Sequence, residues 1–261
     1  MRVVVKIGTS SICGDDGLLM EERVQDLAQQ MAWACEHHHE LIVVSSGAVG
    51  AGIGQTGRHP MDLVEKQALA AIGQAQLIQA YQRHLPGIAV AQILLTRADL
   101  EHGEGRDNAS NTLQRLLAWG ALPIVNENDT VTHEEIRIGD NDTLAARVAQ
   151  LVHAELLVLL SDVDGLYTAD PRTSPHAQHI SQVQWVTDEM LSQHAVSRGP
   201  WGTGGMQTKL QAAALAQESR IRTVLADSRT PDVLMHLLQG LPLRATYFLG
   251  QENPDHIPSM E

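Results

Sequence analysis

The chain has 261 residues, of which 43% are hydrophobic and only 3% aromatic, so it can bury a sizeable aliphatic core in one large domain or two small ones. Its net charge of −13 argues against nucleic acid as a partner, because neutralising phosphates requires clustered Lys and Arg, but it leaves a single nucleotide open as a ligand. The sequence contains neither an apolar run near the roughly 20 residues of a membrane span nor the apolar region of a signal peptide, which predicts a cytoplasmic protein.

Apolar runs of strand length alternate with helical patterns along the first half of the chain. The runs that predict strands are residues 2–7, 41–44, 88–95 and 122–125. Helical spacing predicts a helix from Met20, a long helix over 63–84 and a shorter one over 112–119. The polar stretch 97–111 is predicted to be a loop.

The second half continues the same alternation. Strands are predicted at 156–160 and 222–226, and helices at 143–153, 188–195, 210–217 and 230–239. Repeated strand–loop–helix units predict βαβ crossovers and a mostly parallel sheet with helices on both faces, within one domain.

Small polar residues follow four of the predicted strands. They occupy residues 8–11, 45–52, 126–142 and 161–162. In sheets of this kind ligands bind beyond the carboxyl ends of the strands. The sequence therefore predicts a binding site at this edge of the sheet.

The densest of these polar stretches is 126–142. Two similar segments, 126–129 and 140–142, flank a short β-type segment at 135–138, which predicts a hairpin that carries two clusters of hydrogen-bonding groups. We favour a binding site here, and a solvated acidic loop is the alternative.

A glycine-rich loop at 199–209, which ends at Lys209, opens the helix predicted at 210–217. Free backbone N–H groups and the helix dipole at such a position favour phosphate. The loop is not a Walker A motif, because Thr208 stands where that motif has Gly. A mobile surface loop is the alternative interpretation.

A second lysine, Lys6, lies at the end of the first predicted strand, two residues before Gly8. Phosphoryl transfer depends on positioning and on charge neutralisation, and two lysines could flank the transferring group. Either Asp142 or Asp129 could be the carboxylate that holds these lysines.

Cysteine and histidine offer no comparable signal. Cys13 and Cys35 have no metal-ligand or redox spacing, which predicts two reduced thiols. The 13 histidines are scattered over predicted helices and loops, which indicates solvated side chains. The run 37–39 is interpreted as an exposed helix end, with metal binding as the alternative.

Seven motifs in this order resemble the amino acid kinase family and, within it, the glutamate 5-kinases. Four are typical of the whole family, at 5–10, 44–48, 161–172 and 202–209. Three are typical of the glutamate 5-kinases, at 94–99, 126–129 and 139–142. The resemblance extends from Arg2 to about Gly240.

The resemblance implies a three-layer αβα sandwich around a mostly parallel open sheet of about eight strands. It implies a kinase domain over 1–250 and a polar tail over 251–261, without the PUA domain that many bacterial members carry. The implied activity is ATP-dependent phosphorylation of the γ-carboxylate of L-glutamate, the first step of proline biosynthesis. Mg²⁺ would be bound mainly through the nucleotide phosphates. Implied partners are proline as a feedback inhibitor, glutamate-5-semialdehyde dehydrogenase as the acceptor of the product, and further copies of the chain in a dimer or tetramer.

The resemblance also assigns roles to residues whose positions match the motifs. The implied catalytic residues are Lys6, Lys209 and Asp142. The implied glutamate-binding residues are Ser46, Gly47, Asp129 and Asn141, with Asp129 attracting the ammonium group by charge complementarity. The implied ATP-binding residues are Lys6, Gly8, Ser161, Asp162, Thr203, Gly204, Gly205, Met206, Gln207, Thr208 and Lys209. No residue is expected to bind a metal ion directly.

Two alternatives stay open at this point. One is another member of the same family, acting on N-acetylglutamate, carbamate or a nucleoside monophosphate. The other is a sensor that keeps the fold and binds a ligand without turnover. The motifs at 126–129 and 139–142 argue against the first, and the retention of both Lys6 and Lys209 argues against the second.

Overall fold

The computed structural model describes residues 1–131, 141–171, 173–193 and 205–250. An eight-stranded sheet forms its centre, with the strand order β3-β4-β2-β1-β5-β9-β10-β8. The strands are β1 (Arg2–Ile7), β2 (Glu40–Ser45), β3 (Val90–Leu95), β4 (Leu122–Glu127), β5 (Leu156–Ser161), β8 (Gln182–Val183), β9 (Arg222–Asp227) and β10 (Ala245–Phe248). Neighbouring strands are parallel except β9 and β10. A separate small sheet pairs β6 (Leu166–Tyr167) with β7 (His179–Ile180).

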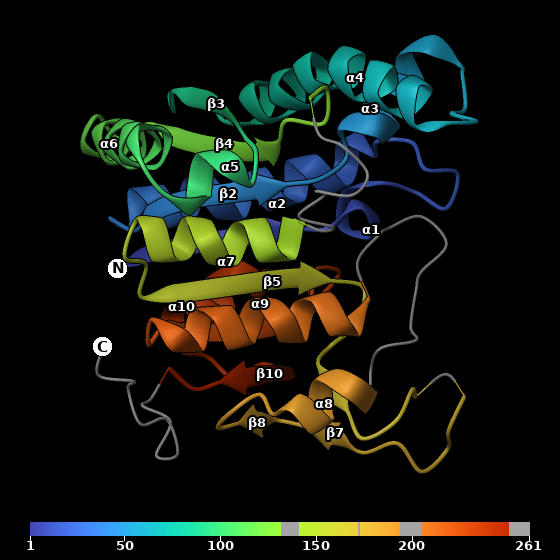
Figure 1. Ribbon diagram of the computed structural model, residues 1–261, viewed down its shortest axis with the longest axis vertical. Helices are drawn as coiled ribbons and strands as arrows, with labels where there is room; N and C mark the ends of the chain where they lie inside the picture. Colours follow the sequence, from blue (N-terminus) through green and yellow to red (C-terminus); the bar gives the residue numbers. More distant parts are fainter. Residues whose placement is uncertain (132–140, 172, 194–204, 251–261) are drawn as a thin grey trace.

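Helices cover both faces of the sheet, which confirms the predicted αβα sandwich (Figure 1). One layer contains α5 (Ala98–Glu101), α6 (Glu104–Ala118), α7 (Asn141–Leu151) and α9 (Met206–Glu218). The opposite layer contains α2 (Glu21–Glu36), α4 (Leu63–His84) and α10 (Val233–Gln239). The remaining helices are α1 (Thr9–Ile12), α3 (Ala48–Thr56) and α8 (Asp188–Gln193). Within the described ranges, no helix has both the length and the apolar character that crossing a bilayer requires.

The side chains of β1 alternate between the two layers, as the twofold period of a strand requires. Val3 and Val5 pack with α2 and α4, whereas Val4 packs with α7. Both sides of this strand are buried because parallel neighbours and helices surround it. Lys6 continues the alternation on the Val4 side, which directs its side chain toward the layer of α7 and α9.

Two predicted loops prove to be helical. Most of 97–111 lies in α5 and α6, because Leu100, Leu113 and Leu117 supply buried apolar contacts that stabilise helices despite the local glycines. The small-residue turn predicted at 45–52 contains the first half of α3. The strand β10 was not predicted, because its residues, Ala-Thr-Tyr-Phe, contain no aliphatic run of the kind that marked the other strands.

A close crossing explains why α3 is a helix of small residues. A Cβ atom at Gly73 would lie 1.8 Å from the carbonyl oxygen of Ala48, and one at Gly52 would lie 2.1 Å from that of Leu69. Only glycine allows the backbones of α3 and α4 to approach this closely. The crossing fixes α3, and with it the residues that precede it at the end of β2, against the long helix α4.

Candidate active site

Three charged side chains meet at the carboxyl edge of the sheet. The ammonium group of Lys6 lies 2.6 Å from Asp142 Oδ1, and that of Lys209 lies 3.1 Å from Asp142 Oδ2. The carboxylate of Asp142 is fully buried, and both lysines are buried as well. Thr208 donates its hydroxyl group to the same Oδ2 atom at 2.9 Å. Asp142, rather than Asp129, therefore holds the two lysines.

The sequence brings these groups together from three distant elements. Lys6 is the penultimate residue of β1, Asp142 is the second residue of α7, and Lys209 lies in the first turn of α9. The chain contains only three lysines, Lys6, Lys66 and Lys209, so two of the three converge on one buried carboxylate. A charged cluster inside a protein is costly to bury and structurally unnecessary, which makes a functional role the natural explanation.

A cluster of amide and hydroxyl groups lies next to the charged triad. Asn141, the neighbour of Asp142, donates from Nδ2 toward three oxygen atoms: Ser46 Oγ at 2.8 Å, Asn126 Oδ1 at 3.0 Å and the Ser45 carbonyl at 3.3 Å. The strands β2 and β4 supply these acceptors from their carboxyl ends. The predicted residues Ser46 and Asn141 thus meet in one polar cluster beside Asp142.

Gly47 makes the turn between β2 and α3. Its φ angle of +101° lies in the left-handed region, and a Cβ atom there would approach Ile12 Cδ1 to 2.8 Å. Glycine satisfies both constraints. The turn places the N-terminus of α3, with its free backbone N–H groups, directly beside Ser46.

The residues that were predicted to bind ATP also lie close to the two lysines. A Cβ atom at Gly8 would lie 3.3 Å from Lys6 Nζ, so its absence leaves the ammonium group accessible from that side. Ser161 ends β5, the neighbour of β1, and Asp162 follows it. Ser161 Oγ donates to Asp162 Oδ1 at 3.2 Å. Gly205 and the next residues Met206, Gln207, Thr208 and Lys209 form the N-cap and first turn of α9. The predicted residues Thr203 and Gly204 lie outside the described residues.

An ion pair between Asp227 and Arg229, which was not predicted from the sequence, lies beside Ser161 and Asp162. Asp227 ends β9 opposite Ser161, and Arg229 binds its carboxylate at 2.7 Å while donating to the Asp162 carbonyl at the same distance. Partial burial raises the pKa of Asp227, but hydrogen bonds from Arg229 outweigh that effect and hold the pKa below its usual range. Arg229 therefore presents a fixed positive group at the edge of the predicted nucleotide side.

Asp129 lies in the turn after β4, half-buried, three residues beyond Asn126. Its backbone N–H donates to the Glu127 carbonyl at 3.0 Å, and the N–H of Asn128 donates to the Leu95 carbonyl at 2.9 Å. The turn is thus tied to the end of β3. The predicted hairpin segment 135–138 and the flanking Gly139 and Asp140 lie outside the described residues, and so does the tail 251–261.

Two buried polar side chains behind the amide cluster were not predicted from the sequence. Gln74 and Tyr81 of α4 are buried and bind Asn126 and Ser45, respectively, at 2.9 and 2.8 Å. Burial raises the pKa of Tyr81, so its hydroxyl group stays neutral. The alanine- and glutamine-rich pattern of α4 indicates a solvated face for such residues, and only their partners Asn126 and Ser45 lay in motifs that had been singled out.

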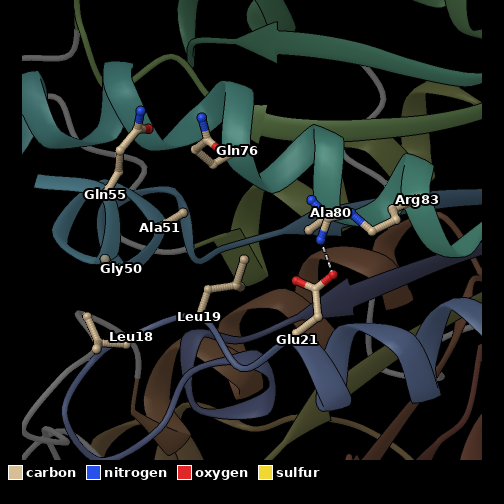
Figure 2. Close-up of a pocket in the computed structure, with 10 residues that line it drawn as sticks. Leu18, Leu19, Glu21, Gly50, Ala51, Gln55, Gln76, Ala80 and Arg83 are labelled. Carbon is tan, nitrogen blue, oxygen red and sulfur yellow. Dashed lines mark hydrogen bonds and ion pairs between the residues drawn. The ribbon is translucent and has the colours of Figure 1, made fainter.

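A separate hollow of about 430 Å³ lies between α3, α4 and the segment before α2 (Figure 2). Its charged lining residues, Glu21 and Arg83, bind each other, and His84 binds the same carboxylate at 2.8 Å. None of the predicted site residues within the described ranges lines it. The hollow is therefore distinct from the charged triad.

The side chains present at the site determine how a metal ion could be bound there. The described residues contain no group of three or more His, Cys, Asp or Glu side chains arranged to hold a metal ion. Both oxygens of Asp142 face lysine ammonium groups. These side chains therefore fit a cation that enters with an anionic ligand rather than one held by a protein cage.

The arrangement is suited to transfer of a negatively charged group. One carboxylate against two ammonium groups leaves an excess positive charge in a buried position between a hydroxyl–amide cluster and a helix N-terminus. Such charges are more effective in a buried site than in water. The geometry brings the Ser46–Asn141 cluster and the first turn of α9 to the same two lysines.

Comparisons with known proteins agree with this geometry. A model of the amino acid kinase family matches residues 1–227. A protein named glutamate 5-kinase from Symbiobacterium thermophilum is 49% identical over 245 residues, covering 92% of each chain. Another from Caldanaerobacter subterraneus subsp. tengcongensis is 44% identical, covering 97% of this chain and 69% of the relative. UMP kinase from Ureaplasma parvum superposes with a TM-score of 0.65 over 95% of this chain and 98% of its own, at 16% identity, a likeness of fold alone.

Proposed function

The chain belongs to the amino acid kinase family, and we propose that it transfers the γ-phosphoryl group of ATP to the γ-carboxylate of L-glutamate. The product is L-glutamyl 5-phosphate, and the reaction is the first step of proline biosynthesis. The observation that carries the proposal is the buried Lys6–Asp142–Lys209 triad, with Asn141 and Ser46 beside it.

The reaction needs charge neutralisation rather than proton transfer. A γ-carboxylate oxygen forms a bond to the γ-phosphorus, and the bond from that phosphorus to the β–γ bridging oxygen breaks, so that ADP leaves with the electron pair. The acceptor is already ionised at neutral pH, since a free glutamate side chain has a pKa of about 4.3. No general base is required, and the principal barrier is the repulsion between two anions.

In this proposal the two lysines relieve that repulsion. The ammonium groups of Lys6 and Lys209 flank the phosphoryl group and stabilise the charge that it carries in the transition state. Asp142 orients both lysines, because each of its oxygens faces one of them. Fixed donors of this kind need no reorganisation during the reaction, which is the source of their effect on rate.

Four residues would hold the acceptor. Ser46 and Asn141 supply hydrogen-bonding groups, and Gly47 allows the N-terminus of α3 to approach a carboxylate. Asp129 supplies the negative charge that attracts the substrate ammonium group. The support for these roles is that the Ser46–Asn141 cluster adjoins Asp142, where the acceptor must meet the lysines.

The phosphates of ATP would lie over Gly8 and the first turn of α9, where backbone N–H groups face an anion. The side chains of Ser161 and Asp162 would bind the nucleotide at the end of β5. We propose that Mg²⁺ is held by the phosphate oxygens, where it neutralises charge, because Asp142 is committed to the lysines. The remaining nucleotide-binding residues would be Thr203, Gly204, Gly205, Met206, Gln207, Thr208 and Lys209.

Membership of the family supports five further proposals. The kinase domain occupies 1–250, and the protein acts in the cytoplasm. Proline inhibits the enzyme at the acceptor side of the site. The chain forms a dimer or tetramer, and glutamate-5-semialdehyde dehydrogenase receives the labile acyl phosphate.

An ADP-release assay tests the central proposal. The protein is supplied with Mg-ATP and, in parallel, with L-glutamate, N-acetylglutamate or L-aspartate. We expect turnover with L-glutamate well above that with the other two acceptors. Turnover with N-acetylglutamate alone would overturn the assignment, and ATP binding without turnover of any acceptor would indicate a sensor.

A further inference from the structure

The helix α4 reaches the acceptor side of the site through a buried glutamine. Gln74 is only 7% exposed, and its Oε1 atom accepts a hydrogen bond from Asn126 Nδ2 at 2.9 Å. Glutamine is usually found on exposed helix faces. Its burial at this position therefore requires an explanation beyond the amphipathic pattern of α4.

The amide of Gln74 is the first member of a chain that ends at the proposed acceptor residues. Asn126 Oδ1 accepts from Asn141 Nδ2 at 3.0 Å, and the same Nδ2 donates to Ser46 Oγ at 2.8 Å. The backbone N–H of Glu127 also donates to Asn126 Oδ1, at 2.9 Å. Two donors thus hold the oxygen end of the Asn126 amide, whereas Gln74 holds its nitrogen end.

Gln74 is a poor choice for stability alone. Its Nε2 atom is buried and contacts no hydrogen-bond acceptor among the described residues. A desolvated donor without an acceptor costs free energy, and a methionine of similar length would avoid that cost. The glutamine is therefore better explained by what its oxygen does for Asn126 than by packing.

The position of Gln74 is set by its neighbours on α4. Gly73 lies so close to α3 that a Cβ atom would meet the Ala48 carbonyl oxygen at 1.8 Å. Two turns further along, Tyr81 shares a hydrogen bond of 2.8 Å with Ser45 Oγ, at the end of β2. The helix is thus fixed against both α3 and β2, and Gln74 projects from a rigid support.

We propose that Gln74 is a positioning residue for the acceptor amino acid. It acts through Asn126, whose amide it orients, on Asn141 and Ser46. Its effect is on affinity for the acceptor and not on ATP or on the charged triad, because the chain of amides ends on the acceptor side. The inference rests on the proposed function of Ser46 and Asn141 in holding glutamate.

The substitution Gln74→Met tests the inference, with Gln76→Met as the matched control. Gln76 lies on the same helix but lines the hollow away from the triad (Figure 2). We expect Gln74→Met to raise the KM for glutamate about fivefold to tenfold, the effect of losing one orienting hydrogen bond. The KM for ATP and kcat should stay within about twofold, and the urea midpoint of unfolding should be unchanged or higher. Gln76→Met should change none of these quantities.

A double-mutant cycle shows whether Gln74 acts through Asn126. In an Asn126→Ala background, Gln74→Met should raise the KM for glutamate no further. Three results would overturn the inference. The first is an unchanged KM for glutamate in Gln74→Met. The second is a rise in that KM in the Asn126→Ala background as large as in the wild type, and the third is an equal rise in the KM for glutamate and for ATP together with a lower urea midpoint. If the wild-type protein phosphorylates a different acceptor, the proposed function fails instead, and the same cycle is then run with the acceptor that is used.

Discussion

At the scale of single residues, the decisive feature is the charge around Asp142. Its buried carboxylate faces Lys6 and Lys209 and leaves the cluster with one excess positive charge, inside a molecule whose net charge is −13. The local charge, not the overall charge, decides which ligand binds, because buried charges are screened far less than exposed ones. A phosphoryl group between the two lysines would complete the neutralisation of the cluster.

The variant Lys209→Met tests the role of this excess charge. We expect kcat to fall about 100-fold to 1,000-fold, because the ammonium group stabilises charge that is greatest in the transition state. The KM for glutamate should change by less than about threefold. Steady-state kinetics measures both quantities, and Lys66→Met serves as the control, because Lys66 lies on α4 away from the triad. A rise in KM with kcat unchanged would contradict the assignment.

The variant Asp129→Ala tests the proposed contact with the substrate ammonium group. Loss of the negative charge should raise the KM for glutamate about tenfold or more and leave the KM for ATP nearly unchanged. Asp129→Asn keeps the size of the side chain but removes its charge, and we expect a similar rise. Titration of each substrate at saturating levels of the other provides the measurement. Equal losses for both substrates would argue against a role in binding the acceptor.

At the scale of elements, the crossing of α3 and α4 connects the acceptor side to the rest of the fold. α3 begins directly after Gly47, and α4 packs against it at Gly52 and Gly73 without room for a side chain. Tight helix contacts of this kind transmit displacements because protein interiors are packed as densely as crystals. A change at the crossing should therefore reach the turn that holds Ser46.

The variant Gly73→Ala tests how closely the two helices pack at this crossing. The added methyl group must displace the Ala48 carbonyl, and we expect the free energy of unfolding to fall by about 1–3 kcal/mol. Gly54→Ala is the control within α3, since the nearest atom to its Cβ would be Leu18 Cδ2 at 3.9 Å. That substitution should stabilise the helix by up to about 1 kcal/mol. Urea unfolding monitored by circular dichroism measures both effects, and equal values for the two variants would refute the steric argument.

At the scale of the whole molecule, the site joins elements that the sheet holds side by side. Ser161 and Asp227 end β5 and β9, and Lys6 and Asn126 are the penultimate residues of β1 and β4. Ser46 directly follows β2, and these strands are neighbours in the order β4-β2-β1-β5-β9. These five strands are consecutive in the sheet (Figure 1), so in the proposed function the two substrates would bind across its centre. Binding should therefore stabilise the entire fold rather than a single segment.

Thermal unfolding tests this expectation. At about 100 times its Kd, Mg-ATP should add about 2.7 kcal/mol to the free energy of unfolding. That corresponds to a rise in Tm of roughly 5–10 °C for a chain of this size. The Lys66→Met variant should show the same rise as the wild type. A folded protein whose Tm does not respond to Mg-ATP would contradict the proposed nucleotide side.

Much of the fold could be predicted because its signals are local. The strands β1, β2, β4, β5 and β9 consist mainly of aliphatic residues, as expected of a parallel sheet buried on both faces. The polar residues at their carboxyl ends identified the edge where the triad lies. By contrast, α5 and the first half of α6 lie in a polar stretch, and β10 has no aliphatic run, so these elements depend on contacts with distant parts of the chain.

The sequence by itself determined which residue types stand at the carboxyl ends of the strands, because the length of a strand and the polarity at its end depend on residues that are close together in the chain. Only the tertiary structure decided which of them meet. It selected Asp142 over Asp129 as the partner of Lys6 and Lys209, because α7 directs its first turn toward the end of β1. It also brought the buried amide of Gln74 to Asn126, 52 positions away, a contact without local signal because it arises from the packing of a helix on a strand end.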